Sequence, residues 1–299
     1  GSRVEIAPFK KDPTDFILWK PSTKPVPGWE SPWGYGRPGW HLECSAMSEK
    51  TLGLPFDIHS GGMDLTFPHH ENEIAQSCAA HEKVNDPKFF AKYWFHNGFV
   101  IVDGEKMSKS VGNIKLVHDL INQYSGETLR LTLLSAHYRQ PLNWTADSIN
   151  QNNSMLERLY RTMKDLNDIE IFDNEKFIPK NIMMALCDDL NTPKVLAELN
   201  SLANRASHAS ASEKKKIKSG MLATGELIGI LQESPEKWLG YGHSETLDSK
   251  TIDSLIKNRN EARRNKNFAL ADSIRDELKN KAIEIEDTNN GTIWRSIKK

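Results

Sequence analysis

Runs of apolar residues alternate with a polar, helix-like segment in the first hundred residues of the chain. Residues 56–60 (FDIHS) and 93–102 (YWFHNGFVIV) are rich in apolar, aromatic and β-branched residues, which favour strands. The first run precedes a turn at residues 61–64 (GGMD). Residues 69–83 (HHENEIAQSCAAHEK) predict a helix, and Pro68 suits its first position. Strand, helix and strand in succession predict a parallel α/β layer.

A further helix and a loop-rich segment precede this layer. Residues 40–53 (WHLECSAMSEKTLG) place Trp40, Cys44 and Met47 on one helical face, and Gly53 suits the C-cap. The residues before them are dense in proline, glycine and tryptophan, which excludes a long helix or strand. Their tryptophans predict a packed rather than a disordered segment.

The remainder of the chain is predominantly helical. From residue 117 to about residue 231, apolar residues recur at helical spacing, which predicts a helical bundle. Residues 234–249 (SPEKWLGYGHSETLDS) have the composition of a linker. The final segment predicts two helices and then a β-hairpin around the turn TNNG, residues 288–291.

Composition narrows the class of protein without identifying a function. The 299 residues are 38% apolar and 26% charged, as in ordinary globular proteins. Three cysteines argue against a disulfide framework and for a reducing, cytoplasmic environment. No apolar run approaches the roughly 18 residues that span a membrane, so no membrane partner is expected. A net charge of −1 does not by itself indicate a nucleic-acid partner.

Two histidines and two glutamates lie within five residues at the start of the 69–83 helix. His69 and Glu73 are four residues apart, so they share a helical face and can bind one ion. His70 and Glu71 point elsewhere. The alternative is an ordinary helix N-terminus, where the helix dipole favours acidic residues.

Cys44 strengthens the metal interpretation from a separate helix. Cysteine, histidine and glutamate together suit Zn²⁺, which then needs a fourth ligand or an open position. The alternative for Cys44 is a small buried apolar residue. We assign that alternative to Cys78 and Cys187.

A lysine-rich loop follows the second strand-like run. Residues 106–110 (KMSKS) lie between Gly104 and Gly112, which allow the loop to move. Lys106 and Lys109 can stabilise the charge that develops on a polyphosphate as pyrophosphate leaves. A solvated surface loop is the alternative.

The KMSKS loop in this setting resembles the second ATP-binding motif of class I aminoacyl-tRNA synthetases. Five blocks resemble the cysteinyl-tRNA synthetase family, and the resemblance extends over essentially the whole chain. They are GRPGWHLECSAM, FDIHSGGMDLTFPHHENEIAQS, WFHNGFVIVDGEKMSKSVGN, DDLNTPKVL and IEIEDTNNGTIWR.

The resemblance implies an α/β plus α fold in three domains. Residues 1–117 correspond to the second half of a Rossmann-like catalytic domain, residues 118–233 to a tRNA-binding helical bundle, and residues 250–299 to a small α+β anticodon-binding module. The family's HIGH-type motif and one further zinc-ligand cysteine are not found in this sequence. We therefore expect them in a segment that precedes residue 1.

The resemblance also implies site residues and cofactors. One Zn²⁺ is held by Cys44, His69 and Glu73, and it binds the thiolate of the substrate cysteine. Trp40 and His59 line the pocket for that substrate. ATP, with Mg²⁺, is bound by the residues Lys106, Ser108, Lys109, Gly61, Gly62 and Asp64, of which Lys106 and Lys109 are the catalytic candidates.

The implied partners are L-cysteine, ATP and tRNA-Cys, and a monomer is expected. Arg263, Phe268, Asp272 and Asp287 offer charged and stacking groups for the unpaired anticodon bases. We expect Trp294 in the core of the hairpin module. The implied activity is ATP-dependent ligation of cysteine to tRNA. Two alternatives stay open, which are a cysteine ligase that acts on an amino sugar and a non-catalytic tRNA-binding fragment.

Overall fold

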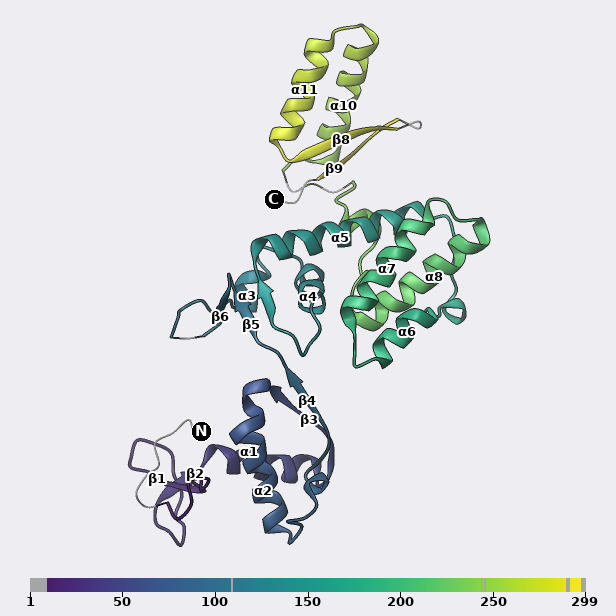
Figure 1. The fold of residues 1–299 in the computed structure, drawn as a ribbon. Coiled ribbons are helices and arrows are strands. Elements are labelled where there is room, and N and C mark those ends of the chain that lie inside the picture. Colours follow the sequence, from purple (N-terminus) through teal and green to yellow (C-terminus); the bar gives the residue numbers. More distant parts are fainter. Residues whose placement is uncertain (1–9, 109, 243, 245, 289–290, 297–299) are drawn as a thin grey trace. The chain divides into compact units, whose positions relative to one another are not determined.

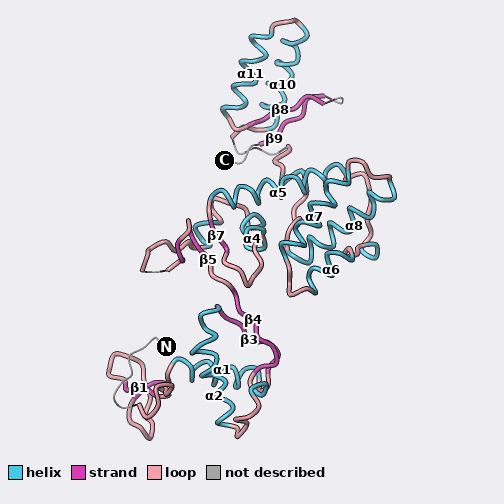
Figure 2. Tube along the Cα trace, in the orientation of Figure 1, coloured by secondary structure: helices cyan, strands magenta, loops and turns pink. Residues whose placement is uncertain are grey.

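The computed structural model of the chain describes residues 10–108, 110–242, 244, 246–288 and 291–296 (Figure 1). Contacts between Cα atoms divide the chain into two compact units. One comprises Gly1–Val100 with Tyr138–Pro141, and the other comprises Ile101–His137 with Leu142–Lys299. Both units combine helices with small sheets of two or three strands (Figure 2).

A parallel pair of strands forms the centre of the first unit. Strand β3 (Phe56–Gly62) pairs in parallel with β4 (Ala91–Asn97), and helix α2 (Glu71–Ala80) lies between them in the sequence. Helix α1 (Trp40–Leu52), which ends at Gly53, contacts α2. The predicted parallel layer and the predicted first helix are both confirmed.

The connections around α2 differ from the prediction in two places. β3 continues through Gly61 and Gly62 to a 3-10 turn at Met63–Leu65. The observed turn therefore begins two residues later than predicted. A π-helical turn at Thr66–His70 precedes α2, and Pro68 lies in it rather than at the first position of the helix. Phe67 explains the difference, because the residue before a proline prefers the extended conformation that Phe67 has. A 3-10 turn at Pro87–Phe89 leads into β4.

The segment before α1 contains one small sheet. Strand β1 (Trp19–Pro21) pairs antiparallel with β2 (Gly36–Pro38). Trp29 is 59% exposed and Trp33 is 78% exposed. The segment is thus ordered in a small sheet, as predicted, but these two tryptophans are largely exposed and do not account for its order.

The run predicted as one strand at residues 93–102 divides into two strands. Its second part is β5 (Val100–Val102), which pairs antiparallel with β6 (Glu105–Lys106) across a turn at Asp103 and Gly104. Strand β7 (Leu142–Trp144) pairs with the other edge of β5 and was not predicted.

A bundle of helices forms most of the second unit, as predicted. Its core includes Leu131, Leu156, Ile182, Leu199 and Met221, which are all fully buried. Thr145 and Ser148 form a capping box at the start of the longest helix. The helices are α3 (Val117–Leu120), α4 (Gly126–Leu134), α5 (Ala146–Asp165), α6 (Lys180–Cys187), α7 (Thr192–Ala206) and α8 (Ala211–Ile228), with a 3-10 turn at Asp173–Glu175.

The segment predicted as a linker is partly a packed element. It contains the short helix α9 (Pro235–Trp238), and Trp238 stacks on Tyr160 of α5 with 4.5 Å between the ring centroids. Trp238 and Leu239 belong to the bundle core. The prediction of a linker is therefore wrong for residues 235–239, because the burial of the tryptophan outweighs the loop-like composition.

The C-terminal module has the predicted order of two helices and a hairpin. Helices α10 (Ser249–Arg264) and α11 (Phe268–Asn280) pack against strands β8 (Ile283–Thr288) and β9 (Gly291–Ser296), which pair antiparallel. Trp294 is buried in the core of the module, as predicted. Residues 289 and 290 of the predicted turn lie outside the described residues.

Within the described part of the chain, no helix has both the length and the apolar character that crossing a membrane requires.

Candidate active site

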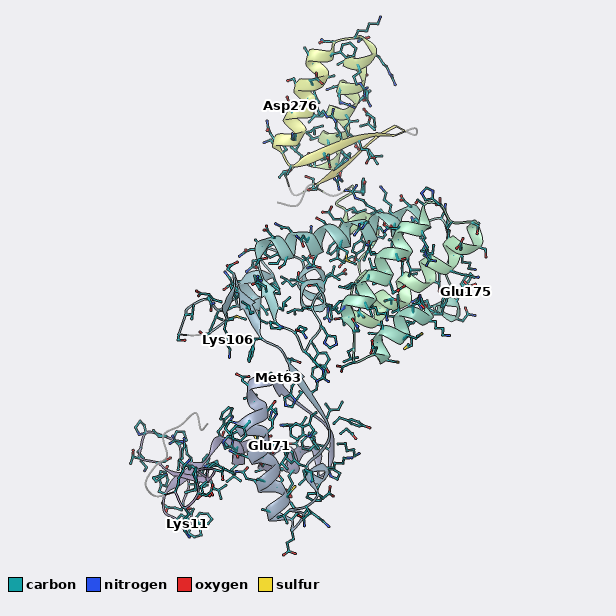
Figure 3. The ribbon with its side chains drawn as sticks, in the orientation of Figure 1. Lys11, Met63, Glu71, Lys106, Glu175 and Asp276 are labelled. Carbon is teal, nitrogen blue, oxygen red and sulfur yellow. The ribbon has the colours of Figure 1, made fainter. Side chains whose placement is uncertain are left out.

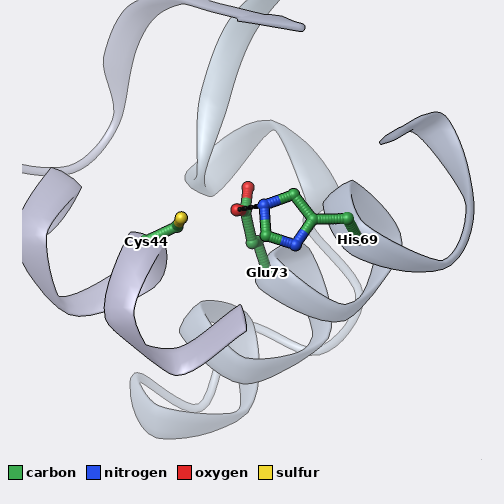
Figure 4. Close-up of side chains that lie close together, drawn as sticks. All are labelled: Cys44, His69 and Glu73. Carbon is green, nitrogen blue, oxygen red and sulfur yellow. Dashed lines mark ion pairs between the residues drawn. The ribbon is translucent and has the colours of Figure 1, made fainter. Parts of the chain in front are cut away.

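Three side chains from three helical segments converge in the first unit. Cys44 comes from α1, His69 from the π-helical turn and Glu73 from α2 (Figure 4). One ligand atom of each residue lies within 4.8 Å of those of the other two. His69 Nε2 lies 2.8 Å from Glu73 Oε1, so the predicted sharing of a helical face is confirmed.

Glu73 is the buried centre of the cluster. Its side chain is fully buried, and His59 Nε2 lies 2.7 Å from the second carboxylate oxygen. No backbone or hydroxyl group of the described residues donates a hydrogen bond to either oxygen. Burial alone would raise the pKa of Glu73, but the hydrogen bond from His59 and the nearby imidazoles lower it. The carboxylate is therefore held in its charged form.

Further histidines surround the cluster. His70 is 3% exposed, and its Nδ1 lies 2.8 Å from His96 Nε2 of β4. His41 Nδ1 lies 2.7 Å from His69 Nδ1. Burial, together with His59, lowers the pKa of His70 to about 4, so this imidazole is neutral at pH 7.

Glu73 is shared by a second group of three residues that sequence analysis missed. Ligand atoms of His59, His70 and Glu73 also lie within 4.8 Å of one another. His70 and Glu71 had both been assigned no role, yet His70 is buried and only Glu71 is exposed. The predicted parallel pairing of the two strands could have indicated this group. The register of β3 and β4 places Gly61 beside His96, so His59 and His96 lie close together on neighbouring strands.

The donor set fits a zinc ion. Burial, and then the charge of Glu73, raise the pKa of the Cys44 thiol to about 11, so the thiol is protonated without a nearby cation. A bound cation reverses this effect, because a coordinating thiol loses its proton. Cysteine, histidine and a buried charged carboxylate are all ligands that Zn²⁺ accepts, and tetrahedral coordination leaves one position for another group.

Trp40 lies against the cluster but is not a core residue. Its ring stacks on that of His69, with 4.0 Å between the centroids and 20° between the planes. The residue is 55% exposed, so it does not belong to the buried core. The aromatic face therefore covers one side of a candidate zinc ligand.

The two glycines at the end of β3 have a packing role. A Cβ atom on Gly61 would lie 2.9 Å from His70 Cε1, and one on Gly62 would lie 2.6 Å from Asp64 Oδ1. Asp64 itself is half-buried in the following 3-10 turn. The glycines thus leave space for His70 and Asp64.

The lysine loop belongs to the second unit. Lys106 is the last residue of β6 (Figure 3), and Lys109 lies outside the described residues. Asn113 closes the loop, because its side chain accepts from the backbone N–H of Ser108 at 2.9 Å and donates to the carbonyl of Lys106 at 3.4 Å. Asn113 had been given no role.

The predicted RNA-binding residues fall into two groups in the C-terminal module. Arg263 pairs with Asp287. Phe268, at the start of α11, is 61% exposed, and Asp272 is exposed one turn later. An exposed aromatic side chain is available for stacking on a base.

Comparisons with known proteins match two parts of the chain to described families. Residues 1–154 match the family described as tRNA synthetases class I (C) catalytic domain, and residues 181–232 match the DALR domain. One curated relative, a cysteine–tRNA ligase from Rhodospirillum rubrum, is 52% identical over 99% of this chain and 64% of its own length. Another, from Parvibaculum lavamentivorans, is 51% identical over 99% of this chain and 63% of its own length.

The chain thus spans less than two thirds of the length of these relatives. Similarity to solved structures is weaker. A complex of Agrobacterium radiobacter K84 LeuRS with tRNA and LeuAMS has a TM-score of 0.48 at 17% identity, over 66% of this chain and 31% of that one. The assignment rests on the sequence matches, and by them the chain belongs to the class I (C) tRNA synthetase family.

Proposed function

We propose that this chain is part of a cysteine–tRNA ligase, which activates L-cysteine with ATP and transfers it to the 3′ end of tRNA-Cys. The name of relatives about 50% identical to the chain supports this activity. The observation that carries the proposal is the cluster of Cys44, His69 and Glu73, because this donor set suits a metal that binds thiols.

The zinc site in this proposal serves to select the substrate. Cys44, His69 and Glu73 hold one Zn²⁺, and the bound ion supplies a position that a cysteine thiolate occupies far better than a serine hydroxyl. A site that requires such a bond rejects the analogue that lacks it by a factor of roughly 10⁴. The site therefore discriminates without an editing reaction.

The surrounding residues keep this site charged and oriented. His59 donates to Glu73, which holds the carboxylate in its charged form at the base of the site. The stacking of Trp40 on His69 limits rotation of that imidazole. We propose that Trp40 and His59 also line the pocket for the substrate side chain.

The lysine loop is proposed to bind ATP, which enters with Mg²⁺. The cysteine carboxylate attacks the α-phosphorus and pyrophosphate leaves. Lys106 and Lys109, with Ser108 between them, stabilise the charge that develops on the leaving pyrophosphate. Gly61, Gly62 and Asp64 are proposed to line the adenylate site. The terminal ribose hydroxyl of the tRNA then attacks the acyl carbonyl, and AMP leaves.

The C-terminal module favours tRNA as the acceptor over an amino sugar. Arg263, Phe268, Asp272 and Asp287 provide cationic, aromatic and acidic groups, of which Phe268 is largely exposed. A small sugar acceptor requires no such module. We further propose that the enzyme is a cytoplasmic monomer.

The test is a charging assay with the longer enzyme that contains this chain. We expect radiolabelled cysteine to be transferred to tRNA-Cys in the presence of ATP, and serine to be excluded. Lys106→Ala should lower the rate of pyrophosphate exchange by roughly 10²-fold or more, because it removes a charge that stabilises the transition state. ATP consumption with cysteine that charges an amino sugar but leaves the tRNA uncharged would overturn the proposal.

A further inference from the structure

One cation of the C-terminal module is buried, in contrast to its neighbours. Arg259 of α10 is 5% exposed, whereas Arg263 and Arg264 on the same helix are exposed. A buried charge is costly unless it is paired and hydrogen-bonded. Arg259 meets this condition with Asp287 of β8, since Nη1 donates to Oδ1 at 2.8 Å and Nη2 to Oδ2 at 2.9 Å. This two-point geometry fixes the carboxylate in one orientation.

The same carboxylate accepts two further hydrogen bonds. Thr292 Oγ1 of β9 donates to Asp287 Oδ1 at 2.8 Å, and Arg263 Nη1 donates to Oδ2. A carboxylate offers about four acceptor sites, and these four donors occupy them. Asp287 is therefore fixed in place by these donors, and it in turn orders the groups that donate to it.

Arg263 is the exposed group that Asp287 holds. It lies four residues after Arg259, so both guanidinium groups leave α10 on one face and reach the same carboxylate. The Arg263 side chain is 48% exposed, and only its Nη1 is paired with Asp287. Arg263 is one of the residues that line a surface pocket, together with Asn260, Arg264, Asp287, Gly291 and Thr292. A donor fixed before binding loses less conformational entropy when its ligand arrives.

We propose that Arg259 is a positioning residue for RNA binding: it orients Asp287, and Asp287 orients Arg263 toward a single-stranded RNA segment at this pocket. The inference rests on the proposed function, because it requires that the C-terminal module binds the anticodon loop of tRNA-Cys. Arg259 itself does not touch the RNA.

The test measures binding of this chain to an RNA hairpin with the anticodon stem and loop of tRNA-Cys. Arg259→Lys keeps the charge but loses the two-point geometry. We expect it to weaken binding by about tenfold, through the lost preorganisation of Arg263. Arg263→Ala should weaken binding at least as much. The double variant should bind within about twofold of Arg263→Ala, because the two residues act in series. Arg275→Ala, which removes an exposed charge on α11, is the control and should leave affinity within about twofold.

A second measurement needs no RNA. In the free chain, the Arg263 Nε–H resonance should be sharp and slow to exchange, and Arg259→Lys should broaden it. Asp287→Asn should reproduce both effects if Arg259→Lys does not fold.

Three results are decisive. A folded Arg259→Lys chain that binds the hairpin as tightly as the unaltered chain overturns the positioning role, and so does a double variant whose losses multiply. An unaltered chain that does not bind the hairpin overturns the RNA-binding function instead. The Arg263 resonance then decides alone whether Arg259 orders Arg263.

Discussion

At the residue scale, Glu73 connects the groups that define the candidate active site. It contacts His69 and His59, and it lies beside Cys44. Helical spacing was enough to pair His69 with Glu73. The same spacing left His70 unassigned, because its burial depends on a strand that is distant in sequence. The contacts of His70 therefore follow from tertiary pairing rather than from local periodicity.

Gly61 provides a residue-scale test of this packing. Gly61→Ala places a methyl group 2.9 Å from the buried ring of His70, and 3.0 Å from Leu65 Cδ1. Overpacking of this kind costs about 1–3 kcal/mol. We therefore expect a lower free energy of unfolding by chemical denaturation. Gly126→Ala is the matched control, since nothing lies within 4 Å of its added methyl group. Equal stability of the two variants would contradict the packing role of Gly61.

At the element scale, the sequence predicted the longer elements and missed the short ones. Helices α1, α5 and α7 carry enough apolar positions for their period to be read. Strand β7 has three residues, which are too few to show any period. Helix α9 has four residues, and its burial depends on the stacking of Trp238 on Tyr160.

A half-buried carboxylate joins α4 to the segment after α8. Glu127 accepts from Tyr160 Oη at 2.9 Å and from the backbone N–H groups of Leu231 and Gln232 at 2.8 and 2.9 Å. Burial, together with the charge of Glu127, raises the pKa of Tyr160, so the phenol stays protonated and donates. Glu127→Ala leaves three donors without this acceptor.

We expect Glu127→Ala to destabilise the chain by about 2–4 kcal/mol, because it removes the acceptor of three hydrogen bonds. Tyr160→Phe removes one of these three hydrogen bonds and also the acceptor of the Glu233 N–H, so it should cost less, about 1–2 kcal/mol. Thermal unfolding monitored by circular dichroism measures both. A Tyr160→Phe variant less stable than Glu127→Ala would contradict this account.

The C-terminal hairpin should be sensitive to acid through Asp287. The hydrogen bond from Arg259, and then those from Thr292 and Arg263, hold the pKa of Asp287 well below its usual range. A carboxyl group with a depressed folded-state pKa stabilises the fold above its unfolded pKa of about 3.9, and this contribution is lost as pH falls further. Stability should therefore decrease below about pH 4.

Tryptophan fluorescence during acid titration measures this effect, because Trp294 lies in the module core. Asp287→Asn should show a shallower decrease of stability between about pH 4 and pH 2. Identical acid titrations of the two chains would exclude Asp287 as the responsible group.

At the scale of the whole molecule, the chain spans about 64% of the length of its relatives. Within the first unit, β3 and β4 form a parallel pair on which Ile58 is 63% exposed and Tyr93 is 69% exposed. Parallel sheets are normally covered on both faces.

The cysteine, histidine and glutamate of the candidate zinc site all come from this one unit. Metal binding can therefore be measured on this chain directly.

The most direct test of the account is the zinc affinity of this chain, measured by competition with a chromophoric chelator. Glu73→Gln keeps the shape of the side chain but removes its charge. Glu71→Gln, an exposed neighbour on α2, is the control. We predict that the unaltered chain and Glu71→Gln bind one zinc ion with similar affinity, and that Glu73→Gln binds it at least about tenfold more weakly. Equal affinities of the Glu73→Gln and unaltered chains would contradict the assignment of Cys44, His69 and Glu73 as zinc ligands.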